Sequence, residues 1–170
     1  MKDLTAERIV ELLGLEPLPR EGGRFAESYR AGEGTAAAAL PARYGGARRF
    51  STAIYYLLTP DAFSALHRLR SDEVFHFYLG DPVEMLQLRP DGSGALLRLG
   101  TDLAAGERPQ VVVPRGVWQG ARLAAGGRLA LLGCTVAPGY EPEDFEAGRR
   151  DDLIAGWPEF RDLIVRLTAG

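Results

Sequence analysis

The sequence predicts an antiparallel all-β sandwich or closed barrel with short helices at its N- and C-terminal ends. Between Phe50 and Gly133, short apolar runs such as FSTAIYYLL and EVFHFYLG alternate with turns such as TPDA, LGDP and PDGSG. No helical pattern separates these runs, which disfavours a parallel α/β sheet. The 170 residues, 46% hydrophobic and 25% charged, have ordinary globular composition. We therefore expect one domain that spans residues 1–170.

The N-terminal segment predicts an amphipathic helix. Thr5 can cap its start, the apolar residues between Ile9 and Leu13 form one stripe, and Gly14 can end it. A Pro- and Gly-rich turn follows and leads into an alternating strand in which Phe25, Glu27 and Tyr29 share one face.

Two further segments complete the predicted fold. Residues 31–46 are rich in Ala and Gly, which indicates a mobile hairpin loop or a short irregular excursion. After Tyr140 the helical pattern returns, with Pro158 suited to a helix start and an apolar stripe that includes Phe160 and Ile164. We expect these C-terminal helices to cover the outside of the barrel.

Charge and composition exclude several classes of partner. The formal net charge of −3 gives no electrostatic footprint for nucleic acid. No segment has the length and hydrophobicity that a membrane span or a secretion signal needs, so we expect a cytoplasmic protein. The single cysteine, Cys134, lies in the run LALLGCTV and is expected to be a small buried hydrophobe.

Two motifs concentrate the residues that could carry chemistry. The first is HRLRSDEVFHFYLG, which runs from His67 through Glu73 and His76 to Gly80 and holds both histidines of the chain. The second is PRGVWQ, which ends at Gln119. An imidazole beside a carboxylate in a β-rich region is typical of metal sites and of general acid–base catalysis.

These motifs resemble the two signature motifs of the cupin superfamily, with Gln119 in the place of the last histidine. The wider pattern, from EGGRFAESYR to GCTVAPGY, is similar to an uncharacterised RmlC-like subfamily of the DUF985 kind. The resemblance implies a double-stranded β-helix jelly roll, or cupin barrel, that forms a homodimer and holds a small molecule inside. The chain departs from the subfamily in its PLPREGG segment, where relatives tend to have PHPEGG.

The resemblance also implies which residues surround the ligand. The expected ligand-binding residues are Phe25, Glu27, Tyr29, Arg30, Ser51, Tyr56, His76, Trp118 and Gln119. Strand alternation argues against His76, because it points away from the barrel if Glu73 points inward and no bulge intervenes.

The same resemblance frames the question of a metal. Cupin metal sites normally use three histidines and a carboxylate, whereas the matching set here is His67, Glu73 and Gln119. An amide oxygen is a poor ligand for the metals that imidazole prefers. The sequence therefore favours a site without a cofactor, and a divalent metal on these three residues is the alternative.

Three functions follow as expectations. The first is a metal-independent epimerase or isomerase of RmlC type, with His67 as base, Glu73 as its partner and a tyrosine as acid. Tyr29, Tyr56 and Tyr140 are candidates for the acid, and Tyr140 is assigned to the catalytic set. The substrate would be an anionic or carbonyl-bearing small molecule. The alternatives are a non-catalytic metabolite-binding cupin and a degenerate metal-dependent enzyme.

Overall fold

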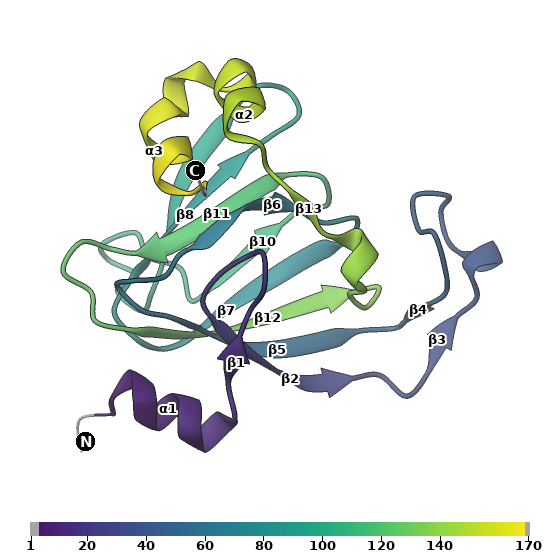
Figure 1. The fold of residues 1–170 in the computed structure, drawn as a ribbon, viewed down its shortest axis with the longest axis horizontal. Helices are drawn as coiled ribbons and strands as arrows, with labels where there is room; N and C mark the ends of the chain where they lie inside the picture. The colour runs from purple at the N-terminus through teal and green to yellow at the C-terminus, as the bar shows by residue number, and fades with distance from the viewer. Residues whose placement is uncertain (1–3, 169–170) are drawn as a thin grey trace.

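Two antiparallel sheets face each other in the computed structural model, which describes residues 4–168 (Figure 1). The first sheet has the strand order β1-β2-β5-β12-β7-β10 and the second β13-β6-β11-β8-β9. Neighbouring strands of both sheets pair antiparallel, as expected for a jelly roll. The predicted jelly-roll fold is confirmed.

The longer strands of the two sheets coincide closely with the predicted runs, whereas the two-residue strands β1 and β13 were not predicted and β13 lies where the pattern after Tyr140 favoured helix. The six-stranded sheet contains β1 (Glu16–Pro17), β2 (Arg24–Arg30), β5 (Thr52–Leu58), β7 (Asp72–Gly80), β10 (Gln110–Val113) and β12 (Ala130–Ala137). The five-stranded sheet contains β6 (Ser64–Arg68), β8 (Val83–Leu88), β9 (Gly94–Leu99), β11 (Trp118–Leu123) and β13 (Glu146–Ala147).

Helices cover the outer face of each sheet. Helix α1 (Ala6–Leu13) begins after Thr5, whose hydroxyl accepts a hydrogen bond from Arg8 N, and ends at Gly14 with a φ of 63°. It packs on Leu57 and Leu131 of the six-stranded sheet. Helices α2 (Arg150–Gly156) and α3 (Arg161–Arg166), with the 3₁₀ turn η3 (Pro158–Phe160) between them, cover the five-stranded sheet (Figure 1). No helix among residues 4–168 has the length and apolar character needed to cross a membrane.

The main core lies between the sheets. Its buried side chains include Tyr56, Phe75, Met85 and Leu132, all at most 1% exposed. Alternation predicts this arrangement, because residues two apart on a strand point to the same face. Along β7, Glu73, Phe75 and Phe77 point inward, but a register shift opposite Leu131 and Leu132 turns Leu79 outward toward α1.

The segment between β2 and β5 forms an arm that extends away from the sheets (Figure 1). Its strands β3 (Gly34–Thr35) and β4 (Arg48–Arg49) pair with each other, with the 3₁₀ turn η1 (Ala37–Ala39) between them. The predicted hairpin is thus present. Arg48 at its base makes a two-point ion pair with buried Asp144 in the 3₁₀ turn η2 (Pro142–Asp144), at 2.6 and 3.1 Å.

Candidate functional site

A cavity of about 260 Å³ opens inside the barrel, beside the core. Its walls are largely apolar and its polar groups gather at one side, which is the usual composition of a small-molecule site. The lining residues are Leu18, Glu21, Phe25, Glu27, Arg30, Thr52, Ile54, His67, Leu69, Glu73, Cys134, Val136, Tyr140, Pro142 and Phe145.

His67 lies on β6 with its ring held in one orientation. Its Nδ1 is 2.7 Å from the carbonyl oxygen of Ala65, and the ring stacks on Phe145 with centroids 4.9 Å apart. Because a carbonyl oxygen only accepts hydrogen bonds, Nδ1 must carry the proton of the neutral ring. The basic lone pair is therefore on Nε2.

Gln119 joins His67 to Glu73. It is paired with His67 in the β6–β11 register and is only 1% exposed. Its Nε2 lies 3.4 Å from His67 Nε2 and also donates to a carboxylate oxygen of Glu73. One amide group thus satisfies two buried acceptors, and the predicted trio is brought together.

Glu73 has an altered acidity because it is buried. Burial raises the pKa of Glu73 from 4.5 to about 7, since removing water disfavours the charged form. Glu21 raises this pKa further, whereas His67 and the hydrogen bond from Gln119 lower it. Glu73 can consequently hold or release a proton near neutral pH.

Glu21 is a site residue that the motif comparison did not single out. Its Oε2 lies 3.9 Å from His67 Nε2, and its Oε1 accepts a hydrogen bond from Ser64 at 2.8 Å. Gly22 and Gly23 follow it with φ values of 101° and 71°. A Cβ on Gly22 would lie 2.3 Å from the carbonyl oxygen of Phe63, so this tight turn requires glycine. In the sequence, the only sign of this role is a glutamate directly before two glycines, a pattern that indicates a tight turn.

Four other predicted residues line the cavity. They are Phe25, Glu27, Arg30 and Tyr140. Arg30 is already engaged, because its guanidinium makes two hydrogen bonds to Glu27, at 2.9 and 2.8 Å, and one to Glu141 at 2.8 Å. Burial raises the pKa of Tyr140 to about 12, so its phenol keeps its proton at neutral pH.

Tyr29 and Trp118 lie away from the cavity. A register shift between Glu27 and Tyr29 breaks the alternation of β2, and Tyr29 is left 55% exposed. Trp118 precedes inward-pointing Gln119 on β11, so it faces the other way, toward the C-terminal helices and beneath the guanidinium of Arg68. Contrary to the prediction, neither residue lines the barrel cavity.

Four further predicted residues also lie outside the cavity lining, and one of them is Gln119, which contacts His67 and Glu73 without lining the cavity itself. Ser51 precedes β5 and donates to the carbonyl oxygen of Val136. Tyr56 is a core residue whose hydroxyl donates to the carbonyl oxygen of Gly22 at 2.9 Å. His76 is on the outer face of β7, where its Nε2 lies 3.1 Å from the hydroxyl of Thr135. Strand alternation accounts for the position of His76.

The trio does not fit a metal ion in this arrangement. A metal would need the lone pairs of His67 Nε2 and Glu73 Oε2, and the amide N–H groups of Gln119 are directed at both atoms. Among residues 4–168, no three His, Cys, Asp or Glu side chains are grouped closely enough to hold a metal.

The raised pKa of Glu73 makes stability depend on pH. Between pH 4.5 and about 7, the native carboxyl keeps a proton that the unfolded chain has lost, so the free energy of unfolding falls as the pH rises. The loss approaches about 3 kcal/mol above pH 7. Glu73→Gln cannot ionise, so its free energy of unfolding relative to wild type should rise by that amount between pH 4.5 and pH 8 in urea titrations.

Glu159 is exposed, so the stability of Glu159→Gln should change with pH as that of wild type does. If the stability of Glu73→Gln also changes with pH as in wild type, the pKa of Glu73 is not raised.

Comparison with known proteins gives the family of the chain. The family model of the cupin superfamily DUF985 matches residues 7–148. An uncharacterised protein of Saccharomyces cerevisiae, YML079W, is 31% identical over 144 residues, which cover 79% of this chain and 71% of the yeast protein.

Solved structures agree with this family. Protein SO0799 from Shewanella oneidensis is 34% identical with a TM-score of 0.84, and the match covers 97% of this chain and 98% of the other. A hypothetical protein from Leishmania major is 30% identical with a TM-score of 0.87, covering 98% and 99%. Oxalate decarboxylase from Bacillus subtilis, 14% identical with a TM-score of 0.54 over 90% of this chain and 37% of its own, shares the fold. The chain belongs to the DUF985 family of the cupin superfamily.

Proposed function

We propose that the barrel cavity is the active site of a metal-independent enzyme of epimerase or isomerase type. Its substrate would be a small molecule with a carbonyl group. The observation that carries this proposal is the fixed ring of His67, whose Nδ1 contacts the carbonyl oxygen of Ala65 and whose Nε2 lies 3.9 Å from a carboxylate oxygen of Glu21 at the cavity. A neutral imidazole with one oriented basic nitrogen suits general base catalysis.

The reaction would begin with proton transfer to His67. Nε2 removes the proton on the carbon next to the carbonyl, the electron pair of that C–H bond forms a carbon–carbon double bond, and the π pair of the carbonyl moves onto its oxygen. Tyr140 and protonated Glu73 both line the cavity and can donate hydrogen bonds to this oxygen. Protonation of the opposite face of the same carbon re-forms the carbonyl and gives an epimer. In a hydroxycarbonyl substrate, protonation of the former carbonyl carbon and of its oxygen, with loss of the hydroxyl proton on the neighbouring carbon, gives an isomer.

The size and polarity of the cavity support a small substrate. A volume of about 260 Å³ lies just below the usual range for sites that hold drug-sized ligands. Apolar side chains such as Phe25, Ile54 and Val136 exclude water from the reacting carbon. Burial of this kind also strengthens the hydrogen bonds of the polar side.

Deuterium exchange tests the proposal without knowledge of the natural substrate. Protein dialysed against EDTA is incubated in D2O with a panel of small ketoses, aldoses and 2-oxo acids, and the loss of α-proton signals is followed by NMR. We expect exchange with at least one compound. Exchange that appears only after a divalent metal is restored would contradict the metal-independent mechanism. Absence of exchange with every compound of the panel would contradict the proposal that the cavity is an active site.

One observation favours a second candidate, a non-catalytic binding protein. The Gln119 amide nitrogen lies 3.4 Å from His67 Nε2, so the lone pair that would act as base already has a hydrogen-bond partner. If a ligand leaves the contact between the Gln119 amide and His67 Nε2 in place, His67 cannot take a proton from it, and the ligand is bound without reaction. Saturable binding of a panel compound, seen as NMR line broadening without exchange, identifies this case.

We also propose that the open part of the six-stranded sheet contacts a second copy of the chain. The strand register places Tyr29, Ala53, Thr135, Val74 and Val112 in one row across this face. Tyr29 and Val112 are 55% and 53% exposed, and neighbouring Tyr78 is 50% exposed. Apolar and aromatic side chains gathered on one open face are typical of a protein interface.

Light scattering after size exclusion tests the homodimer. The wild type should elute with twice the mass of one chain, and Val112→Glu should shift it to the monomer because a charge would be buried at the contact. Leu103→Glu, which changes a 62% exposed residue after β9, is the matched control and should remain dimeric. A monomeric wild type would contradict the proposal.

A further inference from the structure

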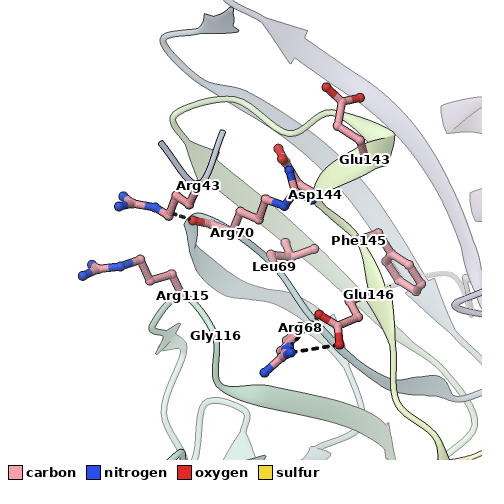
Figure 2. A pocket seen from close by; sticks show the side chains of 10 residues that line it. All are labelled: Arg43, Arg68, Leu69, Arg70, Arg115, Gly116, Glu143, Asp144, Phe145 and Glu146. Carbon is pink, nitrogen blue, oxygen red and sulfur yellow. Dashed lines mark hydrogen bonds and ion pairs between the residues drawn. The ribbon is translucent and has the colours of Figure 1, made fainter. Parts of the chain in front are cut away.

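A second hollow, of about 450 Å³, lies outside the barrel and is lined by four arginines (Figure 2). We call it the arginine groove. Its lining residues are Arg43, Arg68, Leu69, Arg70, Arg115, Gly116, Glu143, Asp144, Phe145 and Glu146. Leu69 and Phe145 also line the barrel cavity, so the two hollows share a wall.

Hydrogen bonds between distant segments hold the groove together. The turn Pro114–Val117 places Arg115 beside β6, because Gly116 adopts a φ of 76° and its N–H donates to the carbonyl oxygen of Leu69 at 3.0 Å. The N–H of Arg115 donates to Asp72 at 2.8 Å. The backbone that carries this guanidinium is therefore fixed at two points.

The arm supplies the third side. The Nε of Arg43 donates to the carbonyl oxygen of Arg70 at 3.1 Å, and its guanidinium lies 4.7 Å from the ring centroid of Tyr44. The hydroxyl of Tyr44 is 2.9 Å from that of Ser71. Figure 2 shows that Arg43, Arg70 and Arg115 come from three separate segments; Arg43 and Arg115 point to the same side of the groove, and the Arg70 side chain runs toward Asp144.

The acidic residues of the groove are already paired. Glu146 makes two hydrogen bonds to Arg68, both at 2.9 Å. Asp144 binds buried Arg48, and Glu143 lies 3.3 Å from the same guanidinium.

Three arginines of the groove have no carboxylate partner among the described residues. Within residues 4–168, no carboxylate lies within 4.0 Å of the guanidinium groups of Arg43, Arg70 or Arg115. All three residues are exposed. Since the whole chain has a net charge of −3, this excess of positive charge is local to the groove.

We propose that the arginine groove binds the phosphoryl group of a small phosphorylated molecule. A guanidinium presents a planar fork of N–H donors that matches two phosphate oxygens, and a phosphoryl group has enough oxygens and charge to engage several such forks. A lone carboxylate has only two oxygens and one charge. The groove is separate from the barrel cavity, so this binding does not depend on the reaction proposed for His67.

Calorimetric titration with inorganic diphosphate tests the site. The full-length wild type should bind diphosphate at low salt, and the affinity should fall as NaCl is added. Arg70→Ala and Arg115→Ala should each weaken binding by about tenfold, because each removes a charge-assisted contact. Arg128→Ala, which changes an 82% exposed side chain near Asp81, is the matched control and should bind as wild type does.

Two further arms complete the experiment. His67→Asn should bind diphosphate with unchanged affinity, which separates this site from the proposed active site. Acetate and citrate should bind at least about tenfold more weakly than diphosphate. Equal affinity in Arg70→Ala, Arg115→Ala and wild type, citrate binding as tight as diphosphate, or no diphosphate binding by wild type would each overturn the proposal.

Discussion

Replacing His67 with asparagine is expected to slow deuterium exchange by about 10²- to 10⁴-fold, the contribution usual for a positioned general base. Asparagine keeps a polar side chain next to Ala65 and Phe145, but it has no basic nitrogen. The initial rate of exchange with the most active compound of the panel measures the loss. Far-UV circular dichroism should show an unchanged fold.

The second histidine of the chain provides the matched control. His76 lies on the outer face of β7 beside Thr135, so His76→Asn should leave the exchange rate unchanged. If both variants lose activity alike, or if His67→Asn exchanges as fast as wild type, then His67 is not the base.

Replacing Asp144 with alanine is expected to destabilise the fold by about 3 to 5 kcal/mol, the usual cost of removing one member of a buried ion pair. The side chains of Arg48 and Asp144 are each 1% exposed, so the guanidinium would lose both hydrogen bonds without gaining water and would keep a carboxylate contact only with Glu143, whose side chain is 55% exposed. Asp144 also accepts a hydrogen bond from the backbone N–H of Glu141, the residue that precedes η2. Urea unfolding at neutral pH measures the change.

Glu146→Ala removes a pair of the same geometry at the surface. Arg68 and Glu146 are also joined at two points, but their side chains are 39% and 56% exposed. Water replaces such a contact, so a loss below about 1 kcal/mol is expected. A similar loss for the two variants would show that burial of the Arg48–Asp144 pair has no energetic consequence.

Much of the fold could be predicted because its pattern is local. Strands such as β5 and β7 are runs of β-branched and aromatic residues bounded by turn residues, and α1 has its cap and its glycine stop within the sequence. The trio of His67, Glu73 and Gln119 was also predictable, because the two motifs that contain these residues resemble the signature motifs of the cupin superfamily.

The remaining features depend on tertiary contacts that leave little local signal. The register shift in β2 that exposes Tyr29, and the one in β7 that turns Leu79 toward α1, arise from pairing with a neighbouring strand. Glu21 reaches the cavity from a glycine turn before β2, and its proximity to His67 follows from the closure of the barrel. Neither effect has a fixed spacing in the sequence.

The wall shared by the two hollows has a thermodynamic consequence. Phe145 stacks on the ring of His67 on one side and lies beneath the guanidinium of Arg20, 4.5 Å from its centroid. A ligand in the arginine groove that shifts Phe145 also shifts the surface on which the imidazole rests. By thermodynamic linkage, if a groove ligand changes the affinity of the barrel for its ligand, the barrel ligand changes the affinity of the groove by the same factor. Phe145 thereby contacts the base of the proposed reaction while it lines both hollows.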